Sequence, residues 1–108
     1  MTRLTRRSLI LAAAAAPVLI AGTAQAATHQ VVIEGMSFAP ATLRIARGDS
    51  VTFTNRDRAP HTATQRPQGF DTGRLNTGGT ASQTFASAGT YEYVCAFHPM
   101  MRGTIIVS

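Results

Sequence analysis

The sequence predicts a small all-β domain, an antiparallel sandwich or barrel, for three reasons. Apolar and polar residues alternate in several short runs, which places each apolar set on one face of a strand. Glycine-containing turns separate these runs at short intervals. After the first 26 residues, no stretch keeps the 3.6-residue apolar period of a helix.

Each predicted strand has its own pattern of side chains. Alternation marks the middle runs, whereas the first and last are β-branched and suit strands buried in a sheet. The predicted strands include residues 31–33, 42–46, 50–54, 91–95 and 104–107. Turn signals lie at residues 47–49, 77–79 and 88–90. The polar, glycine-rich segment 66–79 is expected to be a long loop.

The first 26 residues are predicted to be an export signal. Residues 9–21 are apolar but fall short of the roughly 20 residues that a membrane-spanning helix needs. Arginines precede this stretch, and residues 24–26 form an A-x-A cleavage site. The adjacent arginines at 6 and 7 also fit a twin-arginine signal, so both export routes stay open. We therefore expect a mature domain of residues 27–108 in the periplasm.

The charge pattern and the single cysteine exclude several classes of protein. All 10 basic residues are arginines. Beyond residue 26 there are seven arginines and five acidic residues, which gives a net charge of +2. There is no polybasic run, so nucleic-acid binding is not expected. One cysteine cannot form an internal disulfide, and three histidines are too few for a multinuclear copper oxidase.

Four residues, three near the end of the chain and one upstream, have side chains that can bind a metal ion. Cys95, His98 and Met101 follow a predicted strand at the spacing C-x-x-H-x-x-M, and His61 lies in a turn-rich stretch upstream. A thiolate, two imidazoles and a weak axial thioether are the ligands of a blue-copper electron-transfer site. The neighbouring Met100 leaves the choice of the axial sulfur open at this point.

Other interpretations of the same residues are weaker. Zinc is a poor match because methionine is a poor zinc ligand. Cys95 and His98 could form a nucleophile–base pair, but no third orienting residue or oxyanion-hole motif accompanies them, so we do not expect an enzyme. A periplasmic copper carrier or storage protein is the main alternative. The strand that carries Tyr91, Tyr93 and Cys95 on one face implies a buried thiolate, which disfavours rapid copper exchange.

Residues 31–108 resemble the cupredoxins, and among them the amicyanin and pseudoazurin types. The most specific segments are 88–95 (AGTYEYVC), 98–99 and 101–103, with further similarity at 32–38, 48–53, 55–56 and 59–61. The resemblance implies an eight-strand Greek-key β-sandwich and one type 1 copper ion. It also implies single-electron transfer between larger redox proteins, such as a dehydrogenase, cytochrome or reductase. The H-x-x-M spacing of the family selects Met101 rather than Met100 as the axial ligand.

Two residues depart from the family pattern. Thr62 follows the first histidine where an asparagine commonly ties the two ligand loops together, and Phe97 stands where amicyanins have proline. We expect the Thr62 backbone N–H still to reach the Cys95 sulfur, with a weaker side-chain tie. These departures affect the expected reduction potential and partner rather than the copper.

Two surface features complete the sequence-based expectations. An apolar face for transient docking of redox partners is expected around His98, formed by Met36, Phe97, Pro99 and Met100. The processed protein is expected to be a monomer without a membrane span. After cleavage, His29 becomes the third residue of the chain. An N-terminal amine, two amides and this imidazole could hold a second Cu(II) in a square plane. A solvated histidine is the alternative.

Overall fold

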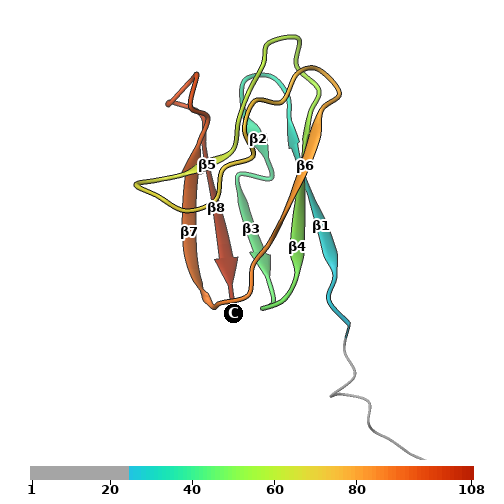
Figure 1. Ribbon diagram of the computed structural model, residues 1–108, viewed down its shortest axis with the longest axis vertical. Coiled ribbons are helices and arrows are strands. Elements are labelled where there is room, and N and C mark those ends of the chain that lie inside the picture. The colour runs from blue at the N-terminus through green and yellow to red at the C-terminus, as the bar shows by residue number, and fades with distance from the viewer. Residues whose placement is uncertain (1–24) are drawn as a thin grey trace, which may run out of the picture.

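The computed structural model describes residues 25–108, which fold into two four-stranded sheets packed face to face (Figure 1). The predicted export signal lies almost wholly outside the described residues. The strands are β1 Thr28–Ile33, β2 Phe38–Ala39, β3 Thr42–Ile45, β4 Ser50–Asn55, β5 Thr64–Gln65, β6 Thr80–Thr84, β7 Gly89–Val94 and β8 Arg102–Val107. The part of the chain that the structure describes contains no helix, so the predicted all-β sandwich is confirmed. Within it, no helix is long and apolar enough to cross a bilayer.

The two sheets are mixed rather than antiparallel throughout. One sheet has the order β2-β1-β4-β6 and the other β3-β8-β7-β5. β1 pairs in parallel with β4, and β3 pairs in parallel with β8. The expectation of a purely antiparallel sheet was therefore wrong at these two pairs. Hairpin signals report only on strands that are neighbours in sequence, whereas both parallel pairs join strands that are separated in the chain.

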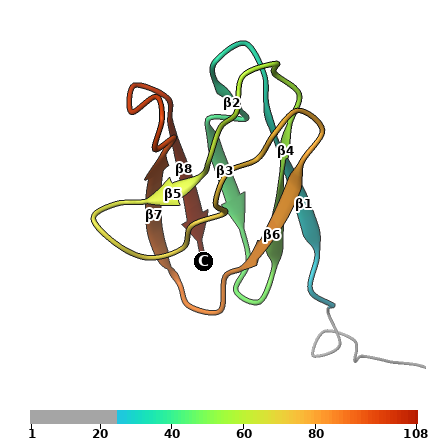
Figure 2. The same ribbon diagram turned by 45° about the horizontal axis from the view of Figure 1, so that its top comes forward.

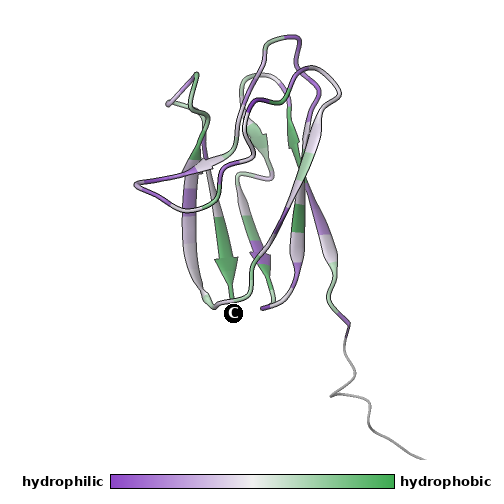
Figure 3. Ribbon diagram, in the orientation of Figure 1, coloured by the Kyte–Doolittle hydropathy of each residue, from purple (hydrophilic) through white to green (hydrophobic). Residues whose placement is uncertain are grey.

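The core lies between the sheets and consists of inward-facing strand residues together with residues of the connecting loops. Figure 3 shows hydrophobic colour on β4 and β8, and hydrophilic colour in the connecting loops and on parts of β1, β3 and β7. Burial of each large apolar side chain contributes about 1.5–3 kcal/mol. The buried members are Val31, Ile33, Phe38, Ile45, Val51, Phe53, Ala63, Leu75, Phe85, Tyr93, Cys95, Met101, Ile105 and Val107.

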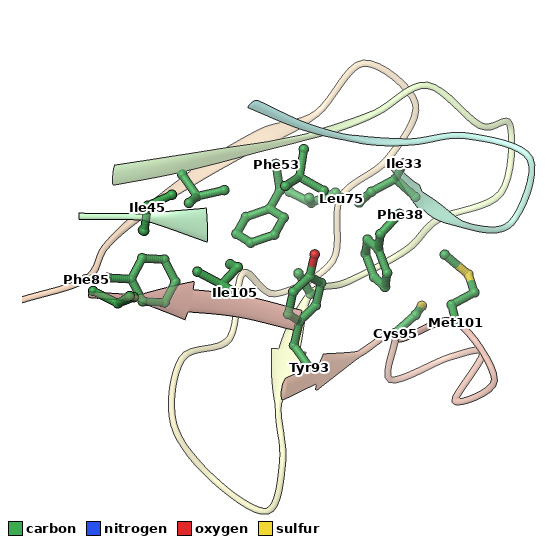
Figure 4. Packing of buried hydrophobic residues seen from close by; sticks show 14 residues of the cluster. Ile33, Phe38, Ile45, Phe53, Leu75, Phe85, Tyr93, Cys95, Met101 and Ile105 are labelled. Atoms are coloured by element: carbon green, nitrogen blue, oxygen red, sulfur yellow. The ribbon is translucent and has the colours of Figure 1, made fainter. Parts of the chain in front are cut away.

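Tyr93 is the centre of this core (Figure 4). Its ring makes edge contacts with Phe38 at 4.7 Å and Phe53 at 5.4 Å between ring centroids. Gly103 lies opposite it in the β7–β8 pair, where a Cβ atom would overlap the tyrosine ring. The glycine therefore leaves the space that this aromatic side chain fills, two residues before Cys95.

The segment 66–79 is a long loop, as expected, with local pairing at two points. Figures 1 and 2 show it leaving β5 and projecting to the side of the sandwich. Phe70 packs against the core and Leu75 is buried within it. Isolated bridges join Leu75 to His61 and Asp71 to Thr64. These contacts hold the polar loop against the end of the sandwich where His61 lies.

The turn between β3 and β4 crosses from one sheet to the other, and Asp49 fastens it to the start of β1. One oxygen of its carboxylate accepts from the Ala27 N–H at 2.9 Å. The other accepts from the Ala46 N–H at 3.1 Å and lies 2.9 Å from His29 Nε2. His29 is thus bound to a carboxylate and its strand is paired with β4, so a square-planar chelate at the N-terminus would have to displace both interactions.

We predict that Asp49→Asn destabilises the protein at neutral pH but not in strong acid. Hydrogen bonds from Ala27, His29 and Ala46 lower the pKa of Asp49 from its usual 3.8 to about 2. A carboxyl group whose folded pKa is depressed stabilises the fold above its unfolded pKa, and this contribution disappears as the pH falls from about 4 to about 2. Urea unfolding of metal-free protein at several pH values measures the effect. An equal difference between wild type and variant at pH 7 and pH 2 would contradict the prediction.

Candidate metal centre

The strand end of β7 and the short loop after it bring three of the predicted ligands together. Cys95 follows the last residue of β7, and three backbone bonds close the loop that it begins. The Cys95 N–H donates to the Met101 carbonyl at 3.2 Å, His98 N–H to Cys95 at 3.2 Å, and Met101 N–H to His98 at 2.9 Å. The C-x-x-H-x-x-M spacing therefore places each donor one turn after the previous one.

His61 reaches the same place from the loop that follows β4. Its N–H donates to the Leu75 carbonyl at 3.1 Å, and the Leu75 N–H donates back to the His61 carbonyl at 2.7 Å. The side chain of Asn55, at the end of β4, donates to the carbonyls of Ala59 and Leu75 at 2.9 and 2.7 Å. His61 is completely buried, so its backbone and its ring are both fixed by the loops around it.

The donor atoms of the predicted site converge on one point. The Cys95 sulfur lies 3.6 Å from Nδ1 of His61 and 3.6 Å from Nδ1 of His98. The ligand atoms of these three residues all lie within 4.8 Å of one another. Met101 is buried, and Figure 4 shows its sulfur at the same end of the core as the Cys95 sulfur. The structure thus brings all four predicted residues to one end of the sandwich.

Thr62 joins the two ligand loops despite standing where asparagine is common in the family. Its backbone N–H points at the Cys95 sulfur at 3.4 Å, as expected from the sequence. Its hydroxyl oxygen accepts from the Ala96 N–H at 2.8 Å and lies 2.8 Å from the Thr64 hydroxyl. The threonine hydroxyl thus reaches the facing loop directly and makes a side-chain tie between the two ligand loops.

Asp57 is a site residue that the sequence analysis missed. Its carboxylate lies 2.9 Å from Nε2 of His61, on the side of the ring opposite Cys95. The same carboxylate accepts from the Gly35 N–H at 2.8 Å and the Met36 N–H at 3.0 Å. These amides, Met36 above all, hold the pKa of Asp57 below its usual range. The sequence offered one indication of this role, because Asp57 lies four residues before the candidate ligand His61.

Asp57, His61 and Cys95 together resemble the arrangement of a cysteine hydrolase, so that alternative needs a structural test. The sequence analysis considered Cys95 with His98, and among the described residues His98 has no carboxylate partner; the histidine that a carboxylate orients is His61, through Asp57. Cys95 and His61 nevertheless have no exposed surface, so a substrate carbonyl cannot approach the sulfur. The burial of Cys95 and His61 therefore disfavours the nucleophile interpretation.

The chemistry of the donor set fits copper better than zinc. The cysteine is free and buried, and both imidazoles direct a ring nitrogen toward its sulfur. The fourth candidate donor is a thioether, which is a soft ligand typical of copper sites. Within residues 25–108, this is the one cluster of at least three histidine, cysteine or acidic residues that could hold a metal ion.

Comparisons with known proteins identify the family to which this domain belongs. The cupredoxin-like domain family matches residues 8–107, a range that begins inside the predicted export signal. Amicyanin-alpha from Methylorubrum extorquens is 33% identical over 89 residues, covering 78% of this chain and 75% of its own length. A purple cupredoxin from Nitrosopumilus maritimus superimposes with a TM-score of 0.70 and 32% identity, covering 74% of this chain and 99% of the other. A copper-containing nitrite reductase from Thermus scotoductus has a TM-score of 0.70 and 34% identity over 75% of this chain but only 22% of the enzyme.

We predict that Thr62→Val destabilises the metal-free protein by about 1–3 kcal/mol. Valine keeps the shape of threonine and the backbone N–H to the sulfur, but it leaves the Ala96 N–H without its acceptor. Urea unfolding monitored by circular dichroism measures the change. Thr90→Val is the control, because Thr90 is exposed on β7 and its substitution should change the stability by less than about 0.5 kcal/mol. Equal effects of the two substitutions would show that the hydroxyl tie contributes nothing.

Proposed function

The chain belongs to the cupredoxin family, and we propose that it is an exported electron carrier whose copper ion is held by His61, Cys95, His98 and Met101. One type 1 copper ion is the cofactor of this domain. A single observation carries the ligand assignment: the free, buried Cys95 sulfur lies 3.6 Å from Nδ1 of each histidine. Such a thiolate between two imidazoles has the composition of a blue-copper centre.

The residues of the chain make one-electron chemistry possible by keeping the donors in place. Copper, when bound, alternates between Cu(I) and Cu(II) and so carries one electron. Cys95 supplies the thiolate, and the Thr62 N–H is directed at its sulfur at 3.4 Å. The backbone bonds of the Cys95–Met101 loop and the His61–Leu75 bridge restrain the donors from moving when the charge changes. Little rearrangement is then needed on electron transfer.

Burial supports Met101 rather than Met100 as the axial donor. Met101 is 4% exposed and belongs to the hydrophobic core, whereas Met100 is 94% exposed. The Met101 N–H is also fixed to the His98 carbonyl. Met100 is instead available to contact a partner protein, so the two adjacent methionines have different roles in the proposal.

We propose that redox partners dock at the apolar surface around His98. Met36, Pro99, Met100 and Met101 line a hollow together with this histidine, and Phe97 is about half exposed beside it in sequence. Exposed apolar patches on small proteins mark interaction sites. The net charge of +2 beyond residue 26 gives only modest long-range steering. These features support transient docking of a monomer to a larger dehydrogenase, cytochrome or reductase.

The proposed location is the periplasm. The support is the arginine-rich start, the apolar residues 9–21 and the A-x-A site at residues 24–26. Cleavage after Ala26 would also leave Ala27 at the edge of the fold, where its nitrogen is already bonded to Asp49.

Two alternative functions are less well supported. A copper carrier exchanges its ion quickly, but the Cys95 and His61 side chains are fully buried. An enzyme needs a place for a substrate beside the metal. The nitrite reductase that resembles this chain is matched over only 22% of its length, so the likeness extends to one domain of that enzyme. We therefore propose electron transfer without catalysis.

The proposal predicts that copper-loaded wild-type protein is intensely blue and reversibly redox-active, whereas Cys95→Ser is colourless. The colour arises from charge transfer between a thiolate and Cu(II), which a serine hydroxyl cannot supply. Visible absorption after addition of Cu(II) to both metal-free proteins measures this, and voltammetry tests reversibility. A blue Cys95→Ser protein would exclude Cys95 as a ligand. A copper-loaded wild type that cannot be cycled would favour the carrier function.

For the docking surface, we predict that Met100→Lys slows electron self-exchange between two copies of the protein about two- to tenfold at low ionic strength. Lysines facing each other near contact repel by roughly 0.4 kcal/mol at 10 Å in water, and the apolar contact of Met100 is lost as well. The visible spectrum should not change. Self-exchange is measured from line widths in NMR spectra of partly oxidised protein.

Ser87→Lys is the matched control for charge. Ser87 is exposed in the turn between β6 and β7, at the end of the sandwich away from His98. This variant carries the same added charge and should leave the exchange rate near that of wild type. Equal slowing by both substitutions would move the docking surface away from Met100.

A further inference from the structure

The two ring nitrogens of His61 face different groups, a thiol on one side and a carboxylate on the other. Nδ1 faces the Cys95 sulfur at 3.6 Å, and Nε2 faces the Asp57 carboxylate at 2.9 Å. A carboxylate accepts hydrogen bonds but cannot donate them when it is ionised. Nε2 must therefore carry the proton, which leaves the lone pair of Nδ1 directed at the site before any metal arrives.

We propose that Asp57 is a positioning residue of the copper site, which fixes the tautomer and orientation of His61 and lowers the reduction potential by strengthening His61 as a donor to Cu(II). The inference rests on the proposed ligand set. It assigns to this aspartate a specific effect on the metal, beyond its contribution to folding.

Asp57 is itself held so firmly that its carboxylate cannot turn away from the ring. Its two oxygens accept from the amides of Gly35 and Met36. Its own N–H donates to the side-chain oxygen of Asn55 at 2.9 Å, and its carbonyl accepts from the Thr77 hydroxyl at 2.6 Å. The amides of Gly35 and Met36 thus hold the carboxylate against the imidazole, while Asn55 and Thr77 fix the backbone of Asp57.

The chemical consequence follows from the charge on the acceptor. An imidazole that donates its N–H to a carboxylate becomes more basic at the other nitrogen, and loss of such an outer partner typically weakens metal binding about 10- to 100-fold. Cu(II) is the more highly charged ion, so it gains more than Cu(I) from a stronger nitrogen donor. Stronger binding of the oxidised ion lowers the potential.

The two histidines of the site differ in this respect. Among the described residues, the Asp57 carboxylate lies against Nε2 of His61, whereas the His98 ring has no carboxylate partner and meets the Cys95 sulfur and the His61 ring. His61 is fully buried and His98 is partly exposed at the apolar hollow. The carboxylate therefore acts on the inner histidine alone.

The fold supplies a matched control for this effect. Asp49 lies 2.9 Å from Nε2 of His29, the same separation as Asp57 from Nε2 of His61. It also accepts from two backbone amides, as Asp57 does. The pair lies at the start of β1 and β4, whereas the copper ligands lie beyond the opposite end of these strands (Figure 1). Asp49→Asn therefore removes the same charge from the same kind of pair, remote from the metal.

The test compares copper-loaded wild type, Asp57→Asn and Asp49→Asn. We expect Asp57→Asn to remain blue, to bind Cu(II) about 10- to 100-fold more weakly and to have a raised potential. A loss of affinity tenfold larger for Cu(II) than for Cu(I) corresponds to a rise of about 59 mV for a one-electron couple. Asp49→Asn should retain both the affinity and the potential of wild type. If Asp57→Asn shifts the potential no more than Asp49→Asn does, the inference is wrong.

A second measurement needs no variant and covers the case in which Asp57→Asn does not fold. In wild-type protein loaded with diamagnetic Cu(I), the Nε2–H proton of His61 should be visible by NMR and exchange slowly with solvent. A His61 ring without a slowly exchanging Nε2 proton would overturn the inference. Failure of the proposed function has a different signature, because wild-type protein would then never become blue.

Discussion

The structure depends on one constraint: a buried thiol must be held between two imidazoles that come from different loops. Cys95 and His98 share the short loop after β7, but His61 comes from the long connection after β4, in the other sheet. The relative positions of the three donor atoms therefore depend on the contacts between these two loops. Thr62 makes such contacts with both its N–H to the sulfur and its hydroxyl to Ala96, so one residue fixes the loops in two directions. Neither sheet alone could keep the three donors in place.

Packing and hydrogen bonds within the sandwich hold both ligand loops in place. Below the site, Tyr93 packs against Phe38 and Phe53, and Gly103 leaves the space for its ring. Beside it, Asn55 connects the end of β4 to the carbonyls of Ala59 and Leu75. A close-packed core and hydrogen-bonded buried amides resist displacement of the ligand loops. Any movement would open a void or leave a buried polar group without a hydrogen-bond partner. This resistance explains how so small a domain can hold a ligand geometry without a disulfide.

Sequence patterns predicted what is local and missed what depends on distant segments. The alternation in Tyr91, Tyr93 and Cys95 reports directly on the faces of β7, and the Cys95–His98–Met101 spacing lies within one loop. The parallel pairs β1–β4 and β3–β8 join strands far apart in the chain, so no turn signal could reveal them. The role of Asp57 in the site and the hydrogen bonds of Asn55 could not be predicted for the same reason. Their roles depend on Gly35, Met36 and Leu75, which reach them only through the fold.

The two histidines show how one ligand type can serve two purposes. His61 is enclosed, braced by Leu75 through its backbone and by Asp57 through its ring, and so it is suited to setting the electronic properties of the site. His98 reaches the apolar hollow beside Met36 and Met100, and so it is suited to passing the electron to a partner. Asp57 also binds the amide of Met36, which lines that hollow. A single carboxylate thus connects the buried histidine to a residue that lines the apolar hollow. The relative position of His61 and Met36 is therefore fixed by direct hydrogen bonds to Asp57.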